Sequence, residues 1–171
     1  MMTLAQLNQL SAAEAATAFA QCCVSQRWIE HMIAARPFAT LEQLCRAADD
    51  IWQGLEEADY LEAFEGHPKI GDVSSLQQKY ASTKALAAGE QSSVNAANDA
   101  IINALAEGNQ SYEQRYGFIF IVCATGKSAA EMLALLQARL SNNRATEVQN
   151  AADEQAKITR IRINKLLGIA G

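Results

Sequence analysis

One histidine occupies a segment whose residue types suit proton transfer. His67 lies within residues 65–71, which interrupt a sequence that otherwise indicates helix almost throughout. Gly66 and Gly71 permit backbone angles that other residues avoid, and Pro68 fixes its own φ and favours an extended His67. An imidazole on a short, stiff loop between helices titrates near neutral pH and is a candidate for catalysis. A helix-breaking turn with a half-exposed histidine explains the same pattern equally well.

An arginine and a glutamate further along the chain could complete a site with His67. Ile158, Arg162 and Leu166 are four residues apart, so Arg162 lies inside an apolar helical stripe. A guanidinium there needs either an internal glutamate as ion-pair partner or a carboxylate ligand. Glu90 is expected in the first turn of a helix, where the helix dipole alone would favour a carboxylate. If the three side chains converge, they could bind a small anion and move protons.

The elements expected to position these residues are helices. Half of the residues are apolar but only 6% are aromatic, and this composition suits close-packed helices better than a sheet. We predict an all-α, single-domain bundle of roughly seven to nine helices spanning residues 1–171. Hydrophobic periodicity and capping boxes predict helices over residues 11–23, 25–35, 40–55, 57–65, 94–107, 128–140 and 145–167.

Two stretches are harder to assign from periodicity. Gly108 and Asn109 indicate a break after the helix over 94–107. The apolar run 118–123 could be a strand or a buried helix, but the chain offers no partner strand. We therefore interpret this run as buried helix or irregular core.

Composition also excludes several functions. A net charge of −5 leaves no basic surface for nucleic acid, and no apolar run is long enough to cross a membrane. The four cysteines form no CxxC pair and have apolar neighbours, which predicts buried free thiols and no metal site. We find no basic segment followed by an apolar core at the amino terminus, so a cytoplasmic protein is expected.

Motifs along nearly the whole chain resemble one enzyme family. In order, they are Trp28-x-x-x-Met32, Arg36-Pro37-Phe38, His67-Pro68-Lys69-Ile70-Gly71, Glu90-Gln91, Tyr116-Gly117-Phe118-x-Phe120-x-x-Cys123-Ala124 and Lys157-Ile158-x-x-Ile161-Arg162-Ile163. Together they resemble the 2-oxo-4-hydroxy-4-carboxy-5-ureidoimidazoline (OHCU) decarboxylases of urate breakdown. The resemblance implies an all-helical homodimer without metal or organic cofactor. It also implies conversion of OHCU to (S)-allantoin and carbon dioxide, after urate oxidase and hydroxyisourate hydrolase have acted.

The resemblance also assigns roles to individual positions. His67, Glu90 and Arg162 correspond to the family's catalytic residues. Positions in substrate-contacting segments are Pro68, Gln91, Phe118, Ile119, Phe120, Ile121, Val122 and Cys123. Ala87 is a departure, because several members carry a serine there, and its hydrogen bond to substrate would have to come from Ser92 or water. The chain shows neither the peroxisomal tripeptide nor a fused second enzyme domain, which is typical of a bacterial member.

Two other functional classes remain open at this stage. A non-catalytic helical adaptor would use the acidic segment 40–66, where eight acidic residues accompany Arg46 as the one basic residue. In that case the three candidate side chains need not converge. A metal-dependent hydrolase would instead require His31 and His67 to lie together with carboxylates.

Overall fold

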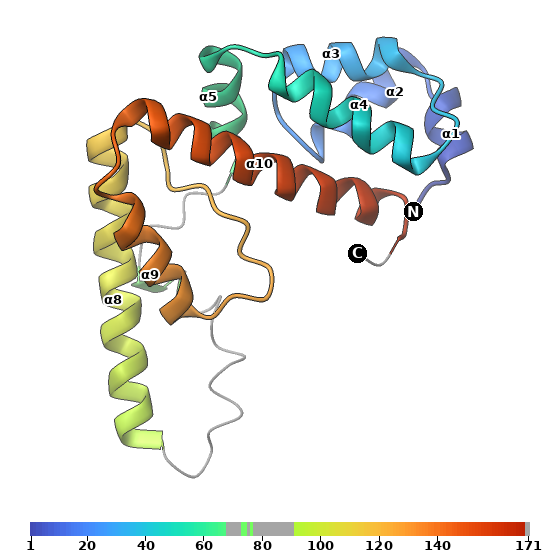
Figure 1. Cartoon of the computed structure of the whole chain (residues 1–171). Coiled ribbons are helices and arrows are strands. Elements are labelled where there is room, and N and C mark those ends of the chain that lie inside the picture. The colour runs from blue at the N-terminus through green and yellow to red at the C-terminus, as the bar shows by residue number, and fades with distance from the viewer. Residues whose placement is uncertain (68–72, 75, 77–90, 170–171) are drawn as a thin grey trace. The chain divides into compact units, whose positions relative to one another are not determined.

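The prediction of an all-α protein is confirmed. The computed structural model describes residues 1–67, 73–74, 76 and 91–169, with the backbone alone for 91–98, and within these ranges it contains eight helices and no strand. They are α1 (Leu4–Gln9), α2 (Ala12–Ala20), α3 (Gln26–Ala35), α4 (Leu41–Gln53), α5 (Glu57–Glu65), α8 (Gln91–Tyr116), α9 (Ala129–Arg139) and α10 (Arg144–Leu166) (Figure 1).

Most helix starts follow from a single hydroxyl-bearing residue. Ser11, Ser25, Thr40 and Ser128 each accept a hydrogen bond from the backbone N–H three residues later, which satisfies one of the free amides at a helix start. α1 was not predicted, although Thr3 and Gln6 form the same kind of capping box.

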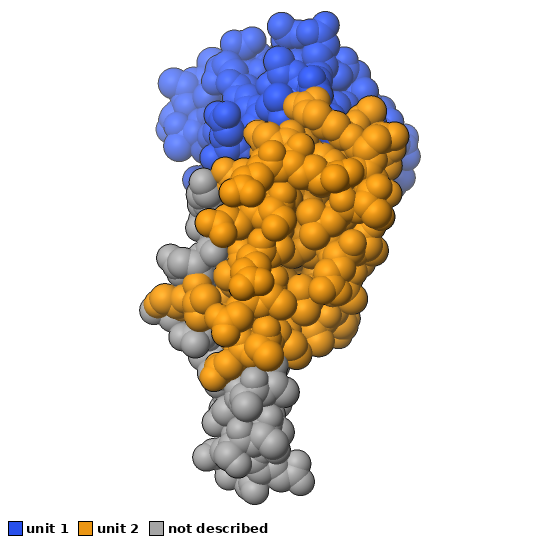
Figure 2. Space-filling view, turned by 90° about the vertical axis from the view of Figure 1, so that its left-hand side faces the viewer, with its two compact units in different colours: residues 1–67, 121–123, 148–171 blue, residues 68–120, 124–147 orange. Residues whose placement is uncertain are grey.

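The described chain divides into two compact units. Unit 1 comprises residues 1–67, 121–123 and 148–171, and unit 2 comprises residues 68–120 and 124–147 (Figure 2). Unit 1 is therefore assembled from both ends of the sequence, with a three-residue segment taken from the middle. The prediction that residues 1–171 form one domain stays a prediction.

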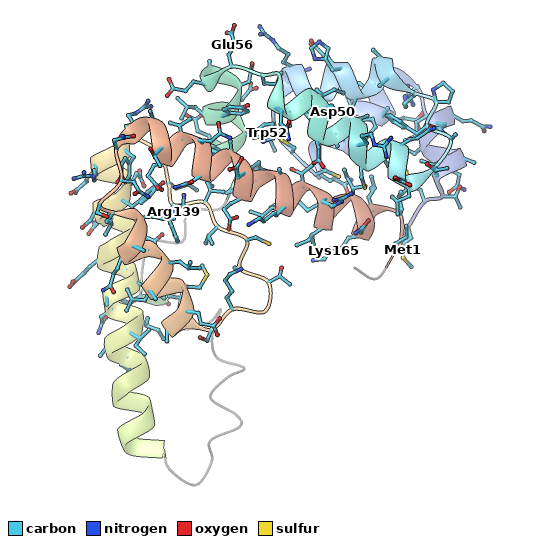
Figure 3. The ribbon with its side chains drawn as sticks, viewed as in Figure 1. Met1, Asp50, Trp52, Glu56, Arg139 and Lys165 are labelled. Carbon is cyan, nitrogen blue, oxygen red and sulfur yellow. The ribbon has the colours of Figure 1, made fainter. Side chains whose placement is uncertain are left out.

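Two tryptophans organise the core of unit 1. Trp28 of α3 is fully buried and donates its indole N–H to the Ala48 carbonyl of α4 at 3.1 Å. Trp52, at the end of α4, donates to the Ala152 carbonyl of α10 at 2.9 Å, and Figure 3 shows its ring directed toward that helix. A buried indole N–H needs such a partner, so these bonds fix how α3, α4 and α10 pack within unit 1.

The helix break predicted at Gly108 and Asn109 is wrong, because α8 runs without interruption from Gln91 to Tyr116. A Cβ at position 108 would lie 2.4 Å from Cδ2 of Leu136, so the glycine is what allows α9 to pack closely on α8. The Asn109 side chain donates to the Leu105 carbonyl at 2.8 Å and does not compete with the helix. Gly108 and Asn109 can therefore both lie inside a helix. For Gly108 the reason is a contact with another helix, which the pattern of apolar residues along the sequence does not reveal.

Unit 2 also contains a buried ion pair. The Glu147 side chain is fully buried and accepts hydrogen bonds from Arg139 Nε at 2.7 Å, the Tyr112 hydroxyl at 2.6 Å and Asn142 Nδ2 at 2.8 Å. Burial and the Glu147 hydrogen bond raise the pKa of Tyr112 well above its usual value. The Arg139 guanidinium also lies 4.6 Å from the centre of the Phe120 ring. These contacts tie the ends of α8, α9 and the first turn of α10 together.

The apolar run 118–123 is irregular, as one of the two sequence interpretations allowed. Phe118, Phe120, Ile121 and Cys123 are buried although the segment is neither helix nor strand. None of the helices in the described ranges is long and apolar enough to span a membrane.

Candidate functional site

His67 is positioned by the end of α5 and by a close approach at Gly66. Its backbone N–H donates to the Phe64 carbonyl at 3.2 Å as the helix ends. A Cβ on Gly66 would lie 2.8 Å from the Val24 side chain, so glycine allows this turn to contact the segment after α2. The imidazole is half-buried, which fits both the catalytic interpretation and the helix-breaking turn with a half-exposed histidine.

Gln155 of α10 contacts the imidazole ring, and Thr159 of the same helix holds Gln155 in place. His67 Nε2 lies 2.5 Å from Gln155 Oε1, and Gln155 Nε2 donates to Thr159 Oγ1 at 3.0 Å. Gln155 is 1% exposed and Thr159 is 7% exposed, so their polar groups depend on partners inside the protein. The Thr159 hydroxyl in turn hydrogen-bonds the Cys23 thiol. A chain of side chains therefore runs from His67 to the segment after α2.

Arg162 lies on the same helix and within electrostatic range of His67. It is half-buried, whereas Arg160 is exposed, as the apolar stripe predicted. Arg162 Nη1 donates to the Cys22 carbonyl at 3.5 Å, a long bond to a neutral acceptor. Among the described residues, the hydrogen-bond partner of Arg162 is this carbonyl. The alternative of an ion pair with an internal glutamate finds no such partner within the same residues. A long, neutral contact leaves the guanidinium suited to an incoming anion.

The electrostatics of the site favour a neutral imidazole. Burial lowers the pKa of His67, the Arg162 charge lowers it further, and the Gln155 hydrogen bond opposes them. The neighbouring thiols are also neutral, because burial raises the pKa of Cys22 and that of Cys23 to about 12. The prediction of buried free thiols is confirmed for all four cysteines.

The segment predicted to contact substrate is divided between the two units. In unit 1, the Cys123 backbone N–H donates to Glu154 Oε1 at 3.1 Å, and Glu154 also pairs with Lys157. In unit 2, Phe118 lies 5.9 Å below the Arg144 guanidinium and Phe120 lies against Arg139. Ile119 and Val122 are half-buried. Residues 121–123 thus belong to the same unit as His67 and Arg162.

Four predicted site residues lie wholly or partly outside the described residues. Pro68, Ala87 and Glu90 lie outside the described residues, and so does the side chain of Gln91, whose backbone begins α8. Of the three predicted catalytic residues, His67 and Arg162 are described and lie in one unit. His31 is exposed on α3. Across the part of the chain that the structure describes, no group of three His, Cys, Asp or Glu side chains could hold a metal ion.

Sequence reasoning missed Gln155 and Thr159. The signal was present, because residues 155, 159 and 162 are spaced by four and three and share one face of α10 with apolar residues. Three polar residues on a buried helical face are unusual enough to mark a functional region. Only Arg162 was recognised, since it is charged.

The sequence also matches known proteins. The sequence pattern that defines the OHCU decarboxylase family matches residues 8–164. The chain is 37% identical over 148 residues to the uric acid degradation bifunctional protein TTL of Arabidopsis thaliana, covering 85% of this chain and 45% of that protein. It is 30% identical over 137 residues to the OHCU decarboxylase of Amia calva, covering 77% of this chain and 75% of that protein. It covers 32% and 33% of two similar bifunctional proteins from Bacillus, so it spans under half the length of the first three relatives.

A solved structure shares both the fold and the sequence. The structure of an OHCU decarboxylase crystallised in the presence of (S)-allantoin has a TM-score of 0.68 and 35% sequence identity. The match covers 87% of this chain and 96% of that one.

Proposed function

The chain belongs to the OHCU decarboxylase family, and we propose that it decarboxylates OHCU to (S)-allantoin and carbon dioxide in urate breakdown. The observation that supports this function is that His67 and Arg162 belong to one unit and lie within electrostatic range of each other. A half-buried imidazole that favours its neutral form can exchange protons, and an arginine whose hydrogen-bond partner among the described residues is a neutral carbonyl can hold an anion. The relatives named for the same reaction or for urate degradation support the substrate class.

The substrate itself supplies the electron sink for this reaction. Its carboxylate is attached to a carbon next to an imine carbon. When the bond to carbon dioxide breaks, its electron pair forms a C=C bond between these two carbons, the π pair of the C=N bond moves onto the nitrogen, and the nitrogen takes up a proton. The resulting enol loses its hydroxyl proton and gains a proton on the carbon that bears the ureido group. The net reaction consumes one proton, and its stereochemistry depends on which face of that carbon is protonated.

The protein's residues then have distinct tasks. A neutral His67 can accept the hydroxyl proton and afterwards donate a proton to one face of the carbon. Arg162 orients the substrate anion and stabilises the negative charge that develops on oxygen. Glu90 polarises His67 or holds the hydroxyl and ureido donors. Backbone and side-chain groups of residues 118–123, together with Pro68, Ala87 and Gln91, contact the rest of the substrate.

A coupled assay tests this function directly. Urate oxidase and hydroxyisourate hydrolase generate OHCU in solution, and circular dichroism follows (S)-allantoin against the slow racemic background. We expect rapid accumulation of one enantiomer from the wild-type protein, with no metal added. His67→Asn should remove most of the activity and leave the helical spectrum unchanged, whereas His31→Asn should behave as wild type. Full activity of His67→Asn would overturn the assignment, and no acceleration by folded wild-type protein would favour the adaptor with its acidic surface.

We further propose that the protein is a cytoplasmic homodimer of the bacterial type. The support for this proposal is the family resemblance alone. Light scattering coupled to size exclusion would test the dimer, since a single species with the mass of one 18.5 kDa chain would contradict it.

A further inference from the structure

Three features outside the predicted catalytic set could carry a further role. They are the buried Glu147 cluster, the adjacent thiols Cys22 and Cys23, and the polar pair Gln155 and Thr159. The Glu147 cluster is saturated with internal donors, and burial keeps the two thiols protonated. Gln155 and Thr159 differ, because they connect directly to the imidazole on which the proposed reaction depends.

We infer that Gln155, held by Thr159, is a positioning residue that keeps a proton on Nε2 of His67 and leaves Nδ1 as the atom that exchanges protons. This inference rests on the proposed function for its catalytic consequence. Its structural content, the tautomer of His67, stands independently of any substrate.

The direction of the hydrogen-bond chain decides the tautomer. A neutral imidazole has one N–H donor and one lone-pair acceptor, and a neighbouring group selects which nitrogen carries the proton. Gln155 directs its amide nitrogen to Thr159 Oγ1, so its carbonyl oxygen faces His67. A carbonyl oxygen accepts, and therefore His67 Nε2 must donate.

The far end of the chain supports the same direction. If the Gln155 amide were rotated by 180°, its Oε1 would face Thr159 and would have to accept from the Thr159 hydroxyl. Thr159 Oγ1 would then lose the hydrogen bond that Gln155 Nε2 donates to it. In the observed arrangement Thr159 Oγ1 accepts from Gln155 Nε2 at 3.0 Å, and its hydroxyl lies against the Cys23 thiol. The sequence of donors therefore runs from His67 through Gln155 to Thr159.

The burial of the pair makes the arrangement rigid. Gln155 is 1% exposed and belongs to the middle of α10, so neither water nor side-chain rotation readily replaces its contacts. The charged side chain that faces His67 from the same helix is Arg162, whose positive charge disfavours the imidazolium. Burial is the largest cause of the lowered His67 pKa, and the Gln155 hydrogen bond opposes both burial and Arg162, so Gln155 orients the ring and increases its basicity.

Nuclear magnetic resonance tests the tautomer without substrate. The chain has two histidines, so a spectrum of the imidazole nitrogens contains two sets of signals, and His31→Asn identifies the set that belongs to His67. Above the pKa of His67 we expect Nε2 to carry the proton and Nδ1 to show the chemical shift of an unprotonated nitrogen. Protonation of Nδ1 with a free Nε2 would overturn the inference.

Substitutions then test whether Gln155 causes this state. Gln155→Leu should lower the pKa of His67 further and decrease kcat by about 10- to 100-fold with little change in KM. Gln155→Glu should shift the same pKa, and the acidic limb of the kcat profile, upward, because a carboxylate favours the imidazolium. Gln149→Leu is the matched control, since Gln149 is an exposed glutamine of α10 that bonds Asp153. Its pKa and kcat should equal those of wild type.

A second pair of variants keeps the test decisive if Gln155 cannot be replaced without unfolding. Thr159→Val removes the acceptor that orients the Gln155 amide, whereas Thr159→Ser retains a hydroxyl. We expect a mixture of His67 tautomers and lower kcat in Thr159→Val, with wild-type behaviour restored in Thr159→Ser. Equal spectra and pH profiles for both variants and wild type would refute a positioning role. The tautomer result holds even if the decarboxylase assay fails, so the two proposals can be judged separately.

Discussion

Removing the charge of Glu147 should destabilise the protein strongly. Glu147→Gln keeps the size of the side chain, but the Arg139 guanidinium is then left beside a neutral amide. Three donors converge on the carboxylate, from Arg139, Tyr112 and Asn142, at 2.7, 2.6 and 2.8 Å. One amide oxygen cannot face all three, so the amide nitrogen must point at a donor.

The magnitude follows from burial. The two side chains of the Arg139–Glu147 pair are 11% and 0% exposed. Breaking a buried pair by removing one partner costs about 3–5 kcal/mol, because the other charge stays in a medium that solvates it poorly. The matched control is Glu42→Gln, whose pair with Arg46 has a similar N–O distance of 2.8 Å but side chains that are 76% and 66% exposed. An exposed pair with i,i+4 spacing contributes only about 0.3–0.5 kcal/mol.

Urea unfolding followed by circular dichroism measures the difference. We expect the free energy of unfolding of Glu147→Gln to fall by about 3–5 kcal/mol and that of Glu42→Gln by under about 0.5 kcal/mol. Added salt should reduce the small effect at Glu42 but not the large one at Glu147. Similar losses in the two variants, or a loss under about 1 kcal/mol at Glu147, would show that burial of the pair does not set its contribution.

Three further predictions concern packing and pH. Gly108→Ala should lower the free energy of unfolding by about 1–3 kcal/mol despite the better helix propensity of alanine, and thermal unfolding should show a smaller loss when the same change is made in a Leu136→Ala background. Trp52→Phe should cost about 1–3 kcal/mol, since the Ala152 carbonyl loses its buried donor, and urea titration would contradict this if the variant matched wild type. The folded protein lowers the pKa of His67 below its ordinary 6.5, so the unfolded chain binds more protons in this region. His67 should therefore contribute stability that is complete above pH 6.5 and is lost as the pH falls toward the folded pKa. Comparison with His67→Asn in acid denaturation isolates this contribution, and parallel pH curves would refute it.

The helices were predictable because their signals are local. Caps such as Ser11 and Ser128 and the apolar periodicity around them depend on neighbours three or four residues away, and the bounds of α5 were predicted without error. Gly108 was misinterpreted as a helix break. A glycine is needed there because the side chain of Leu136, on another helix, leaves no room for a Cβ. Local propensity cannot report such a contact.

The site was predictable where a residue type is chemically distinctive. His67 and Arg162 were recognised from an imidazole on a stiff loop and a charge in an apolar stripe, and the structure places both in unit 1. Gln155 and Thr159 were missed because uncharged polar residues are common in helices and only their burial makes them notable. The roles of Pro68, Ala87, Glu90 and Gln91 stay predictions, because they rest on the family resemblance.

The division of unit 1 along the sequence has a consequence for biosynthesis. Residues 1–67 leave the ribosome before unit 2, yet the indole of Trp52 finds its acceptor at Ala152, one hundred residues later. The nascent amino-terminal helices therefore carry an incomplete apolar surface while the whole of unit 2 is being translated. Closing so long a loop is slow, and exposed apolar surface invites aggregation in the interval. Newly made chains should consequently depend on holding chaperones more than a protein of this length whose core is built from consecutive helices.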